Sequence, residues 1–173
     1  ASDSSAPLTV NAVIADNTSA SALSKSGSGV VVLSAANTFS GATTLSGGPL
    51  LLAHADALQN SIVTLYDGSP LFDASVSGHA FTFGGLAGIR GFALNDTAGN
   101  PVTLTVGQNP AGTTYSGALS GSGSLVKTGA GTLTLTGANT HSGGTTIQAS
   151  STLAAGSTLA LGTGPVVNNG TLN

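Results

Sequence analysis

Residues 127–153, KTGAGTLTLTGANTHSGGTTIQASSTL, repeat residues 25–51, KSGSGVVVLSAANTFSGATTLSGGPLL, without a gap. The two copies start 102 positions apart, and 12 of their 27 residues are identical. Self-similarity at a fixed spacing is typical of proteins built from stacked units. The shared residues that matter most are Lys25 and Lys127, Gly27 and Gly129, Gly29 and Gly131, Asn37 and Asn139, Thr38 and Thr140, and Gly41 and Gly143.

Short strands separated by turns of small residues are expected from residue 8 onward. In the second copy Leu133 and Leu135 fall on one face of a strand, while Thr132, Thr134 and Thr136 fall on the other. No window combines helical spacing with capping residues, so an all-β fold is expected. The expected strands are residues 8–13, 30–33, 62–66, 80–83, 102–106, 132–136 and 166–167, with shorter ones between them.

The spacing of the turns, about 10 residues, suits a sandwich, a barrel or a solenoid. Three features favour the solenoid. The repeat keeps its register without a gap, the strands are too short for a large barrel, and the Asn-Gly or Asp-Gly turns of hairpins are not used consistently. In a parallel β-helix with roughly 20 residues per coil, the copies would lie about five coils apart and the whole chain would form about eight coils.

The composition restricts the possible functions. Apolar residues make up 40% of the chain, charged residues 5%, and the net charge is −3, whereas disordered chains combine low hydrophobicity with high charge. Three basic residues cannot follow a phosphate backbone, so nucleic acid is not an expected partner. The absence of cysteine suits an exported chain that must pass a narrow pore, although a cytosolic chain is also compatible with it.

No group of residues predicts catalysis, so the chain is interpreted as a non-enzyme without cofactor or metal. Only Asp67 and Asp73 are close in sequence, on either side of a turn expected at residues 68–70. Catalysis by paired carboxylates often also uses a base or a metal, and the sequence indicates neither beside them. Arg90 is expected at a solvated edge. The three histidines do not have the spacing of metal ligands. The remaining acids, expected in turns or at the surface, are Asp3, Asp16, Asp56 and Asp96, and the histidines are His54, His79 and His141.

Each repeated copy places an asparagine just after a strand. Asn37 and Asn139 both lie in Ala-Asn-Thr triplets. Asparagine tolerates the left-handed backbone conformation, and its amide bonds readily within a turn. Both are therefore expected to be turn residues, with a ligand contact at Asn139 as the alternative.

Residues 121–147 resemble the autotransporter-associated β-strand repeat, also called the passenger-associated transport repeat, of bacterial type V secreted proteins. The family pattern is Gly-x-Gly-x-Leu-x-Lys-x-Gly-x-Gly-x-Leu-x-Leu-x-Gly-x-Asn-Thr-x-x-Gly-x-Thr-x-Val, and these residues fit it nearly throughout. His141 departs from it, because an aromatic residue such as Phe39 of the first copy is more usual there. The first copy is looser, with Ala35 in place of the usual glycine.

The resemblance implies a right-handed parallel β-helix at the bacterial cell surface or in a secreted protein. It also implies a partner, a C-terminal outer-membrane β-barrel of the same polypeptide that would translocate the passenger. Residues 1–173 are interpreted as a single β-helix segment of a larger passenger, with repeat copies at 25–51 and 127–153.

Two functional hypotheses follow, and ice binding by a threonine ladder is a third. In the first, the segment is a surface stalk whose repeats promote folding-driven secretion. In the second, it is an adhesin that binds host glycan or matrix protein through an exposed Ser/Thr-rich face that includes Thr103, Thr105, Thr132, Thr134 and Thr136. A threonine array aligned over several coils would favour binding, and an irregular array the stalk. The strand edges of an excised β-helix would also promote end-to-end stacking.

Overall fold

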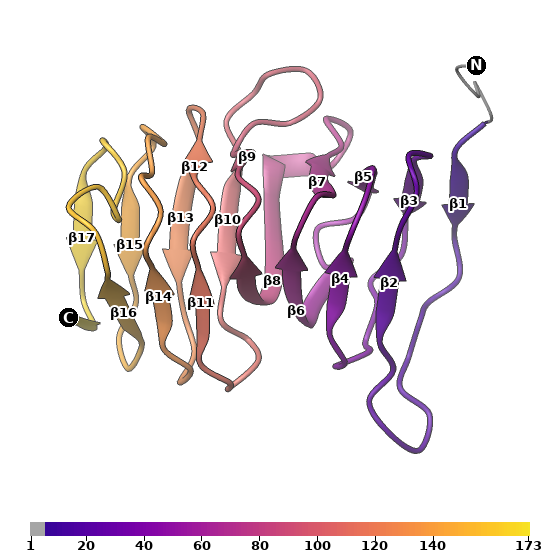
Figure 1. Cartoon of the computed structure of the whole chain (residues 1–173), viewed down its shortest axis with the longest axis horizontal. Helices are drawn as coiled ribbons and strands as arrows, with labels where there is room; N and C mark the ends of the chain where they lie inside the picture. The colour runs from indigo at the N-terminus through magenta and orange to yellow at the C-terminus, as the bar shows by residue number, and fades with distance from the viewer. Residues whose placement is uncertain (1–5) are drawn as a thin grey trace.

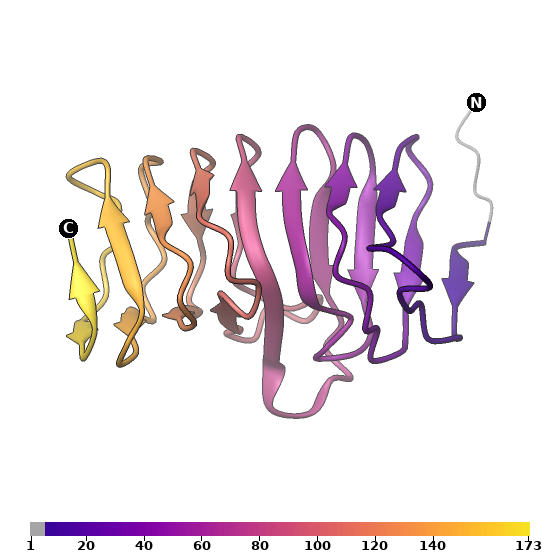
Figure 2. The ribbon, with the colours of Figure 1, turned by 90° about the horizontal axis from the view of Figure 1, so that it is seen from below.

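The structure, a computed structural model, describes residues 6–173 as an elongated solenoid of parallel strands (Figure 1). The strands run across the long axis, and the two ends of the chain lie at opposite ends of that axis (Figures 1 and 2). Each strand pairs with the strand one coil away, and every ladder between named strands is parallel. One short 3-10 helix, η1, covers Ser77–His79. The expected all-β solenoid of about eight coils is confirmed.

The strands form three rows, which we call faces. Face 1 contains β1 Leu8–Val10, β3 Val31–Leu33, β5 Pro49–Leu52 and β7 Ser69–Phe72, and the pair β9 Phe92–Ala93 and β12 Leu119–Ser120 continues it. Face 2 contains β2 Leu23–Lys25, β4 Thr43–Leu45, residues 62–65 of β6 Leu58–Leu65, residues 85–88 of β8 Ala80–Gly88, β11 Thr113–Tyr115, β14 Leu133–Leu135, β16 Thr152–Ala155 and β18 Thr171–Leu172. Face 3 contains residues 80–83 of β8, β10 Thr103–Val106, β13 Ser124–Lys127, β15 Thr145–Ile147 and β17 Val166–Asn168.

Two strands are longer than the sequence pattern predicts, because they continue around a corner of the coil. β6 begins at Leu58 rather than at residue 62, and β8 continues to Gly88. The first half of β8 pairs with β10 on face 3 and its second half with β6 and β11 on face 2. The other expected strands are present with bounds that differ by a few residues.

The turn expected at residues 68–70 is wrong, because β7 begins at Ser69. Pro70 pairs with Leu50 in the ladder, and its side chain is buried next to that of Phe72 in the alternation of the strand. Burial of these alternating side chains therefore outweighs the turn preference of glycine, serine and proline.

The core is a column of side chains that point inward from successive coils. One part of it is aromatic, with Phe72 at centroid distances of 4.7 Å from Phe81 and 6.0 Å from Phe92. Phe92 in turn meets Tyr115 edge-on at 6.1 Å. The strands at the two ends, β1 and β17–β18, are largely exposed.

Candidate functional site

The lysine of the first repeated copy is buried in the turn that follows its strand. Nζ of Lys25 donates to the carbonyl oxygens of Ser26 at 3.1 Å and Gly27 at 2.8 Å in its own turn. It also donates to the carbonyl of Gly47 in the next coil, at 2.9 Å. Lys25 is only 5% exposed, so these three oxygens replace the water that its charge would otherwise bind.

The lysine of the second copy is buried more deeply, at 1% exposure. Nζ of Lys127 donates to the carbonyls of Thr128 and Gly129, both in its own turn. Burial lowers the pKa of Lys127 below the usual value for lysine. Within residues 6–173 neither lysine forms an ion pair, so backbone carbonyls alone compensate the two charges.

The glycines of the repeat have two different roles. Gly27 and Gly129 follow the lysines with φ of +72° and +71°, a conformation that favours glycine and aims the turn carbonyls at Nζ. Gly41 and Gly143 lie against the preceding coil, where an added Cβ would come within 2.2 Å of the Ser21 carbonyl oxygen and 2.5 Å of that of Gly123. These two positions allow adjacent coils to approach closely.

The asparagine of each copy bridges three consecutive coils. Oδ1 of Asn37 accepts the N–H of Ile14 in the coil before at 2.8 Å, and its Nδ2 donates to the carbonyl of Ala57 in the coil after at 2.9 Å. In the second copy, Oδ1 of Asn139 accepts the N–H of Leu119 at 2.7 Å, and its Nδ2 donates to the carbonyl of Ala160.

These contacts overturn the turn interpretation of both asparagines. Neither Asn37 nor Asn139 has a positive φ, and both side chains are buried and point into the solenoid. The amide has a donor and an acceptor, so it can satisfy one backbone group on each side of its own coil. A ligand contact at Asn139 is not compatible with this position, because both amide atoms are bonded to backbone.

The usual aromatic position of the repeat is buried in both copies, as Phe39 and as His141. Nε2 of His141 lies 2.9 Å from Oγ1 of Thr145, which itself donates to the carbonyl of Leu161 at 3.0 Å. The imidazole therefore donates from Nε2, and its buried Nδ1 has no hydrogen-bond partner. Burial lowers the pKa of His141, against a smaller raising effect of its hydrogen bond with Leu119, so the ring is neutral near pH 7.

The remaining repeat residues lie in the core, at the surface or against a neighbouring coil. Leu133 and Leu135 are in the core. Thr38 and Thr140 expose their side chains, while their backbone N–H groups bond to Ile14 and Leu119 of the preceding coil. Gly29 is exposed, and Gly131 packs against the backbone of Ala111.

Both copies of the repeat match the model of a known protein family. A family model described as the passenger-associated-transport-repeat matches residues 23–52 and 125–149. The chain carries two passenger-associated-transport-repeats. No curated protein and no solved structure matches it. Each repeat thus brings one buried lysine, one bridging asparagine and one glycine that lies against the preceding coil, Gly41 or Gly143.

The threonines expected to form one binding face lie on two faces. Thr103 and Thr105 are in β10 on face 3, whereas Thr132, Thr134 and Thr136 lie in or beside β14 on face 2. Each group nevertheless continues into neighbouring coils in register. The outward row on face 2 is Ser24, Thr44, Thr64, Ala87, Thr114, Thr134 and Ala154, and the row on face 3 is Thr82, Thr105, Val126, Thr146 and Val167. Both rows contain aligned small or β-branched side chains, several coils deep.

Within residues 6–173 the acidic residues and the histidines are distributed over several coils. Asp96 is buried at the base of the β9–β10 loop and accepts the N–H groups of Ala98 and Asn100 and the Asn100 side chain. Burial raises its pKa, but these bonds and the charge of His79, whose Nδ1 lies 2.8 Å from Oδ2, bring it below the usual value. Asp16 binds Ser21 and Ser40, and Asp3 lies outside the described residues.

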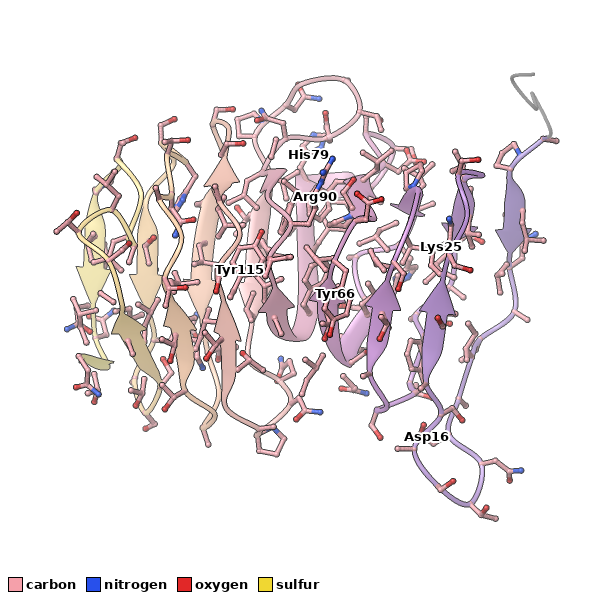
Figure 3. All side chains as sticks on the ribbon, viewed as in Figure 1. Asp16, Lys25, Tyr66, His79, Arg90 and Tyr115 are labelled. Carbon is pink, nitrogen blue, oxygen red and sulfur yellow. The ribbon has the colours of Figure 1, made fainter. Side chains whose placement is uncertain are left out.

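The described part of the chain has few features of a small-molecule site. Over residues 6–173 there is no pocket, and no three His or Asp side chains come together as metal ligands would. Within the same residues no helix has the length and apolar character to cross a membrane. Arg90 is exposed at a coil corner, 3.7 Å from Asp67, and lies near the middle of the solenoid together with Tyr66 (Figure 3).

Proposed function

We propose that the chain is a non-catalytic passenger segment of a bacterial autotransporter, and that it acts as a surface stalk whose repeats promote folding-driven secretion across the outer membrane. The family of the two repeats supports the passenger assignment. The observation that carries the secretion role is the asparagine bridge: Asn37 and Asn139 each bond to the coil before and to the coil after their own.

This bridge makes the folding of one coil depend on its neighbours. Ordering a residue costs about 1–2 kcal/mol of backbone entropy, which a single coil cannot offset by its own contacts. A lone repeat coil would also leave both atoms of its asparagine amide without protein partners. Stacking on an existing coil supplies these bonds together with apolar burial, so folding propagates from coil to coil. In a chain that emerges from a pore, each added coil opposes backward movement.

The second repeat is the better starting point for this process. Lys127 finds both of its carbonyl partners within its own turn, whereas Lys25 also uses Gly47 of the next coil. The second copy would also emerge first if the translocator barrel follows the C-terminus, as in autotransporters. The sparse charge and the absence of cysteine suit passage through the pore.

The test is the display of single variants from an outer-membrane translocator barrel in a Gram-negative host. Asn139→Ala removes the bridge, and Thr140→Ala changes the adjacent exposed side chain as a matched control. We expect the amount of passenger at the cell surface, measured by antibody on intact cells, to fall at least threefold for Asn139→Ala alone. Equal display of both variants at equal expression would refute the secretion role.

Adhesion is the second candidate, and the aligned rows favour it. The outward row on face 2 runs through seven coils, with hydroxyl side chains at five of its positions. A regular surface of hydroxyl groups suits the binding of a host glycan or matrix protein, whereas a stalk does not require one. Binding per displayed molecule, measured in the same cells, separates this role from secretion.

A further inference from the structure

One corner of the solenoid changes composition in two adjacent coils. The corner lies just after face 2, and in four coils it is formed by a Ser-Gly or Thr-Gly pair. In the two middle coils Tyr66-Asp67 and Ile89-Arg90 stand in the same place, as shown by the N–H bonds of Tyr66 to Leu45 and of Ile89 to Leu65. The four Ser-Gly or Thr-Gly corners are residues 26–27, 46–47, 116–117 and 136–137.

The four replacing side chains are exposed and lie together. Tyr66 is 55% exposed and Ile89 67%, so neither contributes much to the core. Oδ1 of Asp67 lies 3.7 Å from Nη1 of Arg90, with both side chains more than half exposed. The fold does not need large residues here, because four other coils use serine, threonine and glycine at the same corner.

The corner is held rigid from inside the solenoid. The hydroxyl of Tyr115, a buried residue in the next coil, donates to the carbonyl oxygen of Arg90 at 2.7 Å. Gly117 also packs closely against that carbonyl. A surface whose backbone is fixed before binding loses less entropy when a ligand orders its side chains.

We propose that Tyr66, Asp67, Ile89 and Arg90 form a binding site for a neutral sugar unit of a glycan. An exposed tyrosine ring offers a flat apolar face for the C–H groups of a sugar ring and a polar hydroxyl at its edge. Arg90 supplies only donors and Asp67 only acceptors, which together suit the hydroxyl groups of a sugar. Because the two charges nearly cancel, the corner has no preference for an anion.

The neighbouring surface supports an extended glycan rather than a protein partner. A stable protein interface buries about 800 Å² on each partner, far more than four side chains on a convex corner provide. Thr44 and Thr64 of the face 2 row lie in the coils that lead to this corner. Successive coils are about 4.8 Å apart, which is close to the length of one sugar ring, so consecutive sugar units can meet consecutive hydroxyl groups.

The test uses the purified 173-residue chain and three neutral probes, cellohexaose, maltohexaose and mannohexaose, with a heparin hexasaccharide as the anionic comparison. Binding is measured by isothermal titration calorimetry, which needs no reporter residue at the corner and therefore applies equally to the original chain and to variants that lack Tyr66. The corner variant combines Tyr66→Ser, Asp67→Gly, Ile89→Ser and Arg90→Gly, which are the residues that other coils already use there. Val167→Ser on face 3 is the matched control for loss of an exposed apolar side chain.

We expect saturable binding of at least one neutral probe, weakened at least tenfold in the corner variant and unchanged in Val167→Ser. Circular dichroism and urea unfolding should show that both variants fold. No binding of any neutral probe at millimolar concentration, binding of heparin alone, or equal weakening in both variants would overturn the proposal. This inference deepens the adhesion candidate, and because binding is measured on purified chain, its failure leaves the secretion result unaffected.

Discussion

Lys25 lies in the same row of stacked residues as Leu135, whereas Lys127, its counterpart in the second repeat, lies on another face. The row runs from Lys25 through Leu45, Leu65, Gly88 and Tyr115 to Leu135. Lys25 and Tyr115 are therefore four coils apart. From Tyr115 the chain passes through face 1 and reaches Lys127 on face 3, which adds two-thirds of a coil. The 102 residues between the copies thus span about four and two-thirds coils. The repeat builds the same local coil from either starting face, which indicates that it stabilises the stack rather than one particular surface.

The buried lysines should contribute to stability although they are charged. Lys127→Met would leave the carbonyls of Thr128 and Gly129 without a donor, at about 1–3 kcal/mol for a buried unsatisfied group. We expect a loss of that size in the free energy of unfolding measured with urea. Arg90→Met removes an exposed cation and should change stability by less than about 0.5 kcal/mol. Equal effects of the two substitutions would show that the carbonyl contacts of Lys127 are not stabilising.

The asparagine bridges should be among the most sensitive polar positions. Asn37→Ala or Asn139→Ala leaves one N–H and one carbonyl unpaired in the two neighbouring coils, at about 1–3 kcal/mol each. Thr38→Ala and Thr140→Ala, one residue away and exposed, should stay within about 0.5 kcal/mol of the original chain. Urea unfolding of the four variants tests this directly, and an asparagine variant as stable as its threonine control would contradict it.

Two glycines of the first repeat should respond in opposite ways to alanine. The Cβ of Gly41→Ala would meet the backbone of Ser21, so we expect a loss of about 1–3 kcal/mol, as for overpacked sites. Gly29→Ala meets no atom within 4 Å and has an ordinary backbone conformation, so we expect it to be neutral or slightly stabilising. Thermal unfolding of both variants provides the comparison, and similar melting temperatures would mean that coil contact at Gly41 is looser than described.

Stability should fall in mild acid because of His141. Burial keeps its pKa in the folded chain below the ordinary 6.5, so the unfolded chain takes up a proton at higher pH than the folded chain. The contribution of the neutral ring is therefore complete above about pH 6.5 and is lost as the pH falls through that value towards the folded pKa. The ring faces Thr145, Gly162 and the Leu119 backbone, none of which is charged.

His141→Phe restores the aromatic residue of the first repeat and should remove this part of the pH dependence. The measurement is the urea midpoint at about pH 7.5 and about pH 5 for both chains, since His54 and His79 are common to them. The same fall in both chains would assign the effect to another group.

The architecture was predictable from the sequence because the same pattern of strands and turns occurs in both copies of the repeat. The alternation at Leu133 and Leu135, and the constant register of the copies, indicated stacked parallel strands. The role of the asparagines was not predictable from local preferences, because their partners Ile14, Ala57, Leu119 and Ala160 lie about 20 residues away. The corner at Tyr66 and Ile89 was missed for the same reason, since only the coil register shows that Ser46 and Ser116 occupy equivalent places.

Coil deletion tests the secretion role most directly. Deleting residues 128–147 removes one 20-residue coil of the second repeat. It joins Lys127 to Gln148, so that Lys127 takes the place of its ladder partner Ile147. Deleting residues 84–106 removes a 23-residue coil between the two repeats in the same way, because Phe83 pairs with Val106, and it leaves the partners of Asn37 and Asn139 in place. With both chains displayed from the same translocator barrel, we expect surface passenger to fall at least fivefold for the first deletion and to change by less than twofold for the second. Equal display of the two deletions would contradict the proposal that the repeats drive secretion.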